Sequence, residues 1–277
     1  MTLRIFPNEE ECLKDLRYRA RGAEIGIVPC TMPFHLGSQQ MFARARSHND
    51  WVVALALPPE DMGLEGWGSR PADLSEQDRE ILIEHGVDAF LRLEKHHSDY
   101  FELTEKKLFS NLGLDADRVT EMCSRFLNLL CRYAPRRLYL YDLYYRESLV
   151  IEELVSEYFK DLEVIHCPLR RELGGLVSSS ANFLLTASEI ESSKGIFETL
   201  QSKFNNCIGL SCKRISRRVA DALEDLEFES VRVFLCGPKN NENAETIGRH
   251  TRIFASVKIR DVVLVDTHSL EIPGERD

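Results

Sequence analysis

Short apolar runs alternate with segments of helical spacing along the first two thirds of this chain. Parallel strands need long crossover connections, which are usually helices, so the alternation predicts a parallel sheet. Sheets of this kind carry helices on both faces, and their strands are apolar because both faces are buried. The runs expected to form strands are residues 24–29, 51–57, 87–93, 136–141 and 162–167.

Two of the helical segments carry clear signals at their ends. Asn8 opens the first, which has acidic residues in its first turn, basic residues in its last turn and Gly22 after it. Ser75 is the expected cap of the other, with Asp78 three residues on and Gly86 as the stop.

The pattern changes after Asn182. An apolar stripe at helical spacing predicts a helix, and its members are Ile190, Phe197, Leu200 and Phe204. A second helical segment follows, and then three strand-like runs with too little chain between them for crossover helices, which predicts a small antiparallel sheet. We therefore expect two domains, residues 1–182 around the parallel sheet and residues 183–277 as a small α+β domain.

Composition and charge exclude several classes of protein. The chain has 43% hydrophobic and 29% charged residues, and no apolar run approaches the ~20 residues of a membrane span. A formal net charge of −10 repels a phosphate backbone, so we expect neither membrane nor nucleic acid as a partner. The first residues do not resemble a secretory signal, and the eight cysteines form no Cys-x-x-Cys pair. We expect a reducing, cytoplasmic location.

A short loop after the strand at 24–29 holds the first candidate site. In VPCTMPFHLGSQQ, His35 and Gly37 stand at the expected start of a helix. Ligands of open parallel sheets bind beyond the carboxyl ends of the strands, where helix N-termini attract phosphates. An imidazole there is able to stabilise a transferring phosphoryl group. The alternative is structural, with a loop histidine and a glycine that only relieves a steric conflict.

The segment GGLVSSSANF, residues 174–183, is a second candidate. Gly174 and Gly175 permit unusual backbone angles, the serines that follow offer hydroxyls, and Asn182 is placed to cap the next helix. Such a loop is suited to hold phosphates. The alternative is a turn between domains whose serines satisfy local backbone groups.

In this order the segments resemble the pantothenate synthetase family, which are pantoate:β-alanine ligases with a Rossmann-like fold of nucleotidyltransferase type. The family's motif Pro-Thr-Met-Gly-Ala-Leu-His-x-Gly-His aligns without a gap on Pro29, His35 and Gly37. Its VPTVREADGLAMSSRN resembles CPLRRELGGLVSSSAN, and the retained positions are Pro168, Arg171, Glu172, Gly175, Leu176, Ser179, Ser180 and Asn182. The resemblance spans nearly the whole chain.

The resemblance implies a reaction in two steps that uses ATP. A carboxylate attacks the α-phosphorus to give an acyl-adenylate and pyrophosphate, and an amine then attacks the acyl carbon and expels AMP. Such catalysis depends on positioning, on Mg²⁺ and on a pocket that excludes water.

The same resemblance assigns the site residues. His35 and Ser38 occupy catalytic positions, and Asp78 occupies that of a metal ligand. Asp61 and Glu147 occupy substrate positions. The implied nucleotide-binding residues are Pro29, Thr31, Gly37, Gly175, Ser179 and Ser180.

Several of these positions depart from the family's pattern. Ser38 stands where the family's first motif has its second His. Leu143 stands at the Lys of the family's segment GEKDxQQL, and Ala181 stands at the Arg of its segment SSRN. Each lost charge-assisted bond is worth about 1.5–3 kcal/mol, which argues against ordinary pantothenate synthesis. Asp61 and Glu147 replace neutral amides, so an amine-bearing substrate is favoured over an acid near them.

We therefore expect a ligase with altered carboxylic acid and amine substrates. Two alternatives remain open. One is a catalytically inactive homologue that binds a nucleotide or a protein partner, and the other is a nucleotidyltransferase with a different adenylylated product. The resemblance also implies a homodimer.

Overall fold

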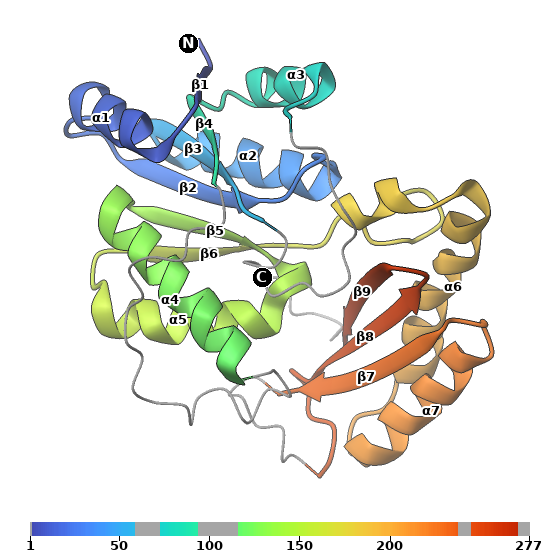
Figure 1. The fold of residues 1–277 in the computed structure, drawn as a ribbon. Coiled ribbons are helices and arrows are strands. Elements are labelled where there is room, and N and C mark those ends of the chain that lie inside the picture. Colours follow the sequence, from blue (N-terminus) through green and yellow to red (C-terminus); the bar gives the residue numbers. More distant parts are fainter. Residues whose placement is uncertain (1, 59–72, 94–115, 238–244, 271–277) are drawn as a thin grey trace. The chain divides into compact units, whose positions relative to one another are not determined.

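The computed structural model describes residues 2–58, 73–93, 116–237 and 245–270, and this part of the chain forms two compact units (Figure 1). The first unit holds the described residues up to Arg170, and the second begins at Arg171. The boundary predicted from the sequence lies later, after residue 182. Arg171 belongs with the second unit because its guanidinium pairs with both carboxylate oxygens of the buried Asp266, each at 2.9 Å.

A six-stranded parallel sheet forms the core of the first unit, and this confirms the predicted fold. Four consecutive residues of one central strand, Val52, Val53, Ala54 and Leu55, are fully buried, as expected for a strand covered on both faces. The strands are β1 (Arg4–Phe6), β2 (Ile25–Cys30), β3 (Trp51–Ala56), β4 (Ala89–Arg92), β5 (Arg137–Tyr141) and β6 (Glu163–Cys167).

The strand order is β1-β4-β3-β2-β5-β6. From β2 the chain moves outward to β3 on one side, whereas β5 is added on the other side and continues to β6. The order of the strands therefore reverses between β2 and β5. In open parallel sheets a ligand crevice forms at the carboxyl ends of the strands at such a point.

Helices cover both faces of this sheet (Figure 1). α2 packs on β2, β3, β5 and β6 and also contacts α3. α4 contacts α5, and an ion pair of 2.8 Å between Arg132 and Glu9 joins α4 to α1. The helices are α1 (Glu9–Arg19), α2 (Leu36–His48), α3 (Glu76–Glu84), α4 (Ala116–Tyr133) and α5 (Tyr145–Tyr158).

The predicted helix ends are confirmed at α1 and α3. The side chain of Asn8 accepts the N–H of Glu11 at 2.9 Å, and Oγ of Ser75 accepts the N–H of Asp78 at 3.0 Å. Each bond satisfies a backbone donor that the first turn of a helix leaves open. Gly86 follows α3 with φ of +68°, a conformation that favours glycine.

The second unit is a helix pair on a small antiparallel sheet, as predicted. The order β7-β8-β9 has antiparallel pairing throughout. Asn182 does not cap the following helix, because the side chain of Thr186 does so in a capping box with Glu189. The elements are η5 (Ser180–Leu184), α6 (Ala187–Phe204), α7 (Cys212–Glu224), β7 (Ser230–Cys236), β8 (Arg252–Ile259) and β9 (Val262–Ser269).

Within the described part of the chain, no helix combines the length and the apolar character that crossing a membrane requires.

Candidate functional site

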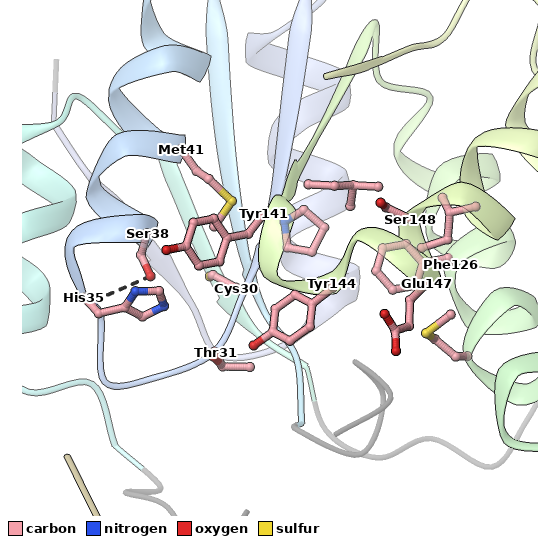
Figure 2. Close-up of a pocket in the computed structure, with 14 residues that line it drawn as sticks. Cys30, Thr31, His35, Ser38, Met41, Phe126, Tyr141, Tyr144, Glu147 and Ser148 are labelled. Atoms are coloured by element: carbon pink, nitrogen blue, oxygen red, sulfur yellow. Dashed lines mark hydrogen bonds between the residues drawn. The ribbon is translucent and has the colours of Figure 1, made fainter. Parts of the chain in front are cut away.

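A pocket of the first unit lies at the carboxyl ends of β2 and β5 (Figure 2). Pro29, Cys30 and Thr31 contribute to its wall from β2 and the loop after it, and Leu140 and Tyr141 contribute from β5. These two strands are neighbours at the point where the strand order reverses. The pocket therefore lies where ligands of open parallel sheets bind.

His35 caps α2 at the edge of this pocket. Its Nδ1 accepts the N–H of Gly37 at 3.2 Å, and its own N–H donates to Oγ of Ser38 at 3.5 Å. The bond to Ser38 Oγ also belongs to a capping box, in which the His35 side chain accepts the backbone N–H of Ser38 in return and a histidine takes the place usual for Ser, Thr, Asp or Asn. Because Nδ1 accepts a hydrogen bond, the proton of the neutral imidazole is on Nε2. His35 and Ser38 are both buried and both line the pocket.

Gly37 makes room for a tyrosine from a distant part of the chain. A Cβ at Gly37 would lie 2.4 Å from Cζ and 2.7 Å from Oη of Tyr141, well below an ordinary van der Waals contact. The Tyr141 ring also lies 5.6 Å from the His35 ring, measured between centroids, and Figure 2 shows it beside the first turn of α2. The same Cβ would lie 2.8 Å from Cε1 of His35, so the steric reason for this glycine is the Tyr141 phenol together with the His35 ring.

Asp78 fixes the loop before α2. One carboxylate oxygen accepts the N–H of Phe34 at 2.7 Å, and the other accepts the hydroxyl of Ser75 at 2.7 Å. The residue is only 4% exposed. The carboxylate thus ties the first turn of α3 to the loop that carries His35.

Glu147 places a carboxylate in the pocket, on the first turn of α5. Its side chain is 13% exposed, and Nη2 of Arg146 forms an ion pair with its Oε1 at 3.8 Å. Much of the surrounding wall is apolar and comprises Met41, Met122, Phe126, Leu140 and Ile151. A carboxylate in such surroundings favours a ligand group that carries a positive charge or donates hydrogen bonds.

Several pocket residues had no role predicted from the sequence, and they include Tyr141, Tyr144, Met41, Met122 and Phe126. One signal was present for Tyr141, because it ends the predicted strand at 136–141 and the carboxyl ends of strands are where sites form. The methionines and Phe126 carried no such signal.

The thiol of Cys30 lines the pocket but is not suited to act as a nucleophile. Burial raises the pKa of this thiol, and Sγ donates to the carbonyl of Leu55 at 3.4 Å. Nucleophilic cysteine chemistry needs the thiolate. The chemistry of the pocket therefore rests on its imidazole, hydroxyls and carboxylate.

The second candidate segment lies in the second unit. Gly174 and Gly175 adopt φ of +93° and +92°, as predicted. Oγ of Ser179 accepts the N–H of Ala181 at 3.2 Å and caps η5, while Ser180 is fully buried. Ser179 thus satisfies a local backbone group. Phosphate binding by Gly175, Ser179 and Ser180 stays a prediction.

The remaining predicted assignments are Asp61, a substrate residue together with Glu147, and Asp78, the metal ligand. Asp61 lies outside the described residues. Asp78, the predicted metal ligand, has both oxygens engaged by protein donors. The described residues contain no group of three or more His, Cys, Asp or Glu side chains that could hold a metal ion. The role of Asp78 as a metal ligand stays a prediction.

Comparison with known sequences identifies relatives along nearly the whole chain. The sequence profile of the family described as pantoate-beta-alanine ligase matches residues 4–269. Pantothenate synthetase from Aquifex aeolicus is 28% identical over 94% of this chain and 97% of its own length. The enzyme from Francisella tularensis subsp. holarctica is 30% identical over 69% of this chain and 76% of its own length.

Solved structures share the fold. Pantothenate synthetase from Thermus thermophilus superposes with a TM-score of 0.76 at 20% identity, covering 97% of this chain and 99% of that one. Pantoate-beta-alanine ligase from Francisella tularensis, solved with beta-gamma ATP and beta-alanine, gives 0.72 at 21% identity over 97% and 98% of the two chains. With a family profile that matches all but the ends of the sequence, this chain belongs to the pantoate-beta-alanine ligase family.

Proposed function

We propose that this chain is an ATP-dependent ligase that joins a carboxylic acid to an amine through an acyl-adenylate, with substrates that differ from pantoate and β-alanine. The supporting observation is the pocket where the strand order reverses, which has His35 and Ser38 on one side and Glu147 on the other (Figure 2). Family membership supports the reaction class, and a structural neighbour was solved with beta-gamma ATP and beta-alanine.

In the first step an oxygen of the substrate carboxylate bonds to the α-phosphorus of ATP, and the bond to the bridging oxygen breaks so that pyrophosphate leaves. Negative charge grows on the transferring group and on the leaving pyrophosphate. The Nε2–H of His35 is the donor proposed to meet it, since Nδ1 is occupied by the N–H of Gly37. Ser38 provides a hydroxyl beside this donor, at the position where the family's first motif has its second His.

In the second step the amine nitrogen bonds to the acyl carbon, the bond to the AMP oxygen breaks, and the amine loses a proton. Glu147 is proposed to hold this amine, because a carboxylate in an apolar wall attracts a cationic or donor group and repels a second acid. The apolar side chains around Glu147 exclude water, which would otherwise hydrolyse the adenylate.

The second candidate function is a homologue that binds a nucleotide or a partner protein without catalysis. The observation that favours it is the Tyr141 phenol packed against Gly37, at the backbone that a phosphate would approach. Such a homologue releases neither pyrophosphate nor AMP, which distinguishes it from the ligase.

The test is to supply ATP and Mg²⁺ with a panel of acids and amines and to measure pyrophosphate and AMP separately. A ligase forms both products only when an acid and an amine are present. Pyrophosphate without AMP indicates a stable nucleotidyl product. Measurable ATP binding with neither product supports the binding homologue and contradicts the ligase.

A matched variant separates catalysis from capping. His35→Asn keeps a side-chain acceptor at a position where Asn is among the best caps, but it removes the Nε2 donor. We expect the variant to unfold at the same denaturant concentration as the wild type and to lose turnover by about 100-fold or more, the usual effect of removing one such donor. Unchanged turnover would remove His35 from the reaction.

The homodimer implied by the resemblance belongs to the same proposal, and light scattering of the purified chain tests it.

A further inference from the structure

The side chain of Tyr141 fills the open side of Gly37. A glycine at a helix start lets a ligand approach the backbone closely because it has no Cβ. Here the space that a Cβ would take is already in contact with Cζ and Oη of Tyr141. The register of the parallel strands causes this contact, since Gly26 pairs with Arg137 and Ile27 with Leu138, which brings the end of β5 beside the loop before α2.

The phenol is held in this position. Its hydroxyl accepts the N–H of Arg170 at 3.0 Å and lies 3.3 Å from the carbonyl oxygen of the same residue, to which it donates. Tyr141 is 3% exposed. Two hydrogen bonds to the main chain and near-complete burial distinguish it from a surface side chain that turns freely.

The backbone donors near the phenol are used within the protein. The N–H of Gly37 donates to His35 and the N–H of His35 donates to Ser38. With these two bonds kept, a phosphate that approaches Gly37 still has to displace the phenol.

We propose that Tyr141 controls access of the nucleotide to the start of α2, so that a triphosphate contacts Gly37 only after the phenol has moved. This inference rests on the proposed function and names the residue that sets nucleotide affinity at the same site. When only a fraction of molecules is competent to bind, the apparent Kd is the intrinsic Kd divided by that fraction. Weakening the hold on Tyr141 therefore tightens ATP binding.

The experiment measures ATP binding to the full chain by isothermal titration calorimetry, with Mg²⁺ and without acid or amine. Tyr141→Phe keeps the ring but loses both bonds to Arg170, and we expect its Kd for ATP to fall by about three- to tenfold. Tyr141→Ala removes the obstacle, and we expect its Kd to fall by about tenfold or more. Circular dichroism establishes that each variant is folded, and Tyr141→Phe carries the test if Tyr141→Ala is not.

Tyr139→Phe is the matched control. Tyr139 stands two residues earlier on β5 and on the same face, is fully buried, and its hydroxyl accepts Nδ2 of Asn49 at 2.7 Å. It does not line the pocket or contact Gly37. We expect the Kd of this variant to stay within about twofold of the wild type, because only the loss of bonds at Tyr141 opens the site.

The outcomes separate this inference from the proposed function. A Kd for ATP that is unchanged or weaker in folded Tyr141 variants, or an equal gain in Tyr139→Phe, overturns the control by Tyr141 whether or not the chain makes pyrophosphate. Tighter ATP binding in the Tyr141 variants with no product from any acid and amine supports the control by Tyr141 and contradicts the ligase.

Discussion

Replacing Gly37 with alanine should destabilise the first unit, although the same change in most helices is stabilising. A Cβ at this position meets Cζ of Tyr141 at 2.4 Å, so the phenol has to retreat by about 1 Å to reach an ordinary contact. That movement strains the packing and weakens the two bonds between the hydroxyl and Arg170. Overpacking of this kind lowers the free energy of unfolding by about 1–3 kcal/mol, whereas the higher helix propensity of alanine raises it by about 1 kcal/mol.

The net expectation is a loss of about 1–2 kcal/mol in the free energy of unfolding. Guanidinium unfolding followed by circular dichroism and tryptophan fluorescence measures it. The decisive comparison repeats Gly37→Ala in a Tyr141→Ala background, where the Cβ no longer meets a phenol. There only Cε1 of His35, at 2.8 Å, still meets the Cβ, so the substitution should cost little, which gives a coupling energy of about 1–2 kcal/mol between the two positions.

An equal cost of Gly37→Ala in both backgrounds would refute this reasoning, because the cost would then be independent of Tyr141. A Gly37→Ala variant more stable than the wild type would refute it as well, because the Tyr141 ring would then have moved without a loss of stability.

Two further predictions concern titration. His166 lies between two carboxylates, with Nδ1 3.4 Å from Oδ1 of Asp142 and Nε2 3.5 Å from Oε2 of Glu152, and the Asp142 carboxylate is the main cause that raises the pKa of His166 above its usual value. The charged ring therefore stabilises the fold below the unfolded pKa of about 6.5, and this contribution disappears as the pH rises through the folded pKa. The difference in unfolding free energy between the wild type and His166→Gln should therefore be larger at about pH 5.5 than at about pH 8.5. A difference that is the same at both pH values would contradict this prediction. In the second unit, hydrogen bonds from Arg260 lower the pKa of Glu189 to about 2. An NMR titration of the Glu189 carboxyl should therefore have its midpoint at about 2 in the wild type and closer to the ordinary pKa in Arg260→Ala. Equal midpoints in the two proteins would show that Arg260 is not the cause.

Local chemistry explains which parts of the fold were predictable. Capping at Asn8 and Ser75 depends on residues within one helical turn, so the sequence alone indicates it. The alternation of apolar runs with helices likewise predicted the parallel sheet. Strand β1 was missed because Arg4–Phe6 is too short to show a pattern, and its place is set by pairing with β4 far along the chain.

The candidate site was predictable only in part, because its geometry depends on contacts across the sheet. The loop at His35 was located from the end of a strand and the start of a helix. Its neighbours Asp78 and Tyr141 come from distant segments, and only the register of the strands and the packing of α3 bring them there. The same holds for the domain boundary, since the partner of Arg171 is Asp266 on β9.

Capping by His35 and its proposed contact with a phosphate are compatible, and one hydrogen bond connects them. A histidine that donated from Nδ1 would offer an acceptor at Nε2, which repels a phosphate. Because the N–H of Gly37 occupies Nδ1, the neutral ring carries its proton on Nε2 and presents a donor instead. A serine or aspartate would cap α2 equally well without supplying that donor. The choice of histidine at this cap is therefore explained by the proposed reaction, whereas the choice of glycine two residues later is explained by the close approach of the Tyr141 phenol and of the His35 ring itself.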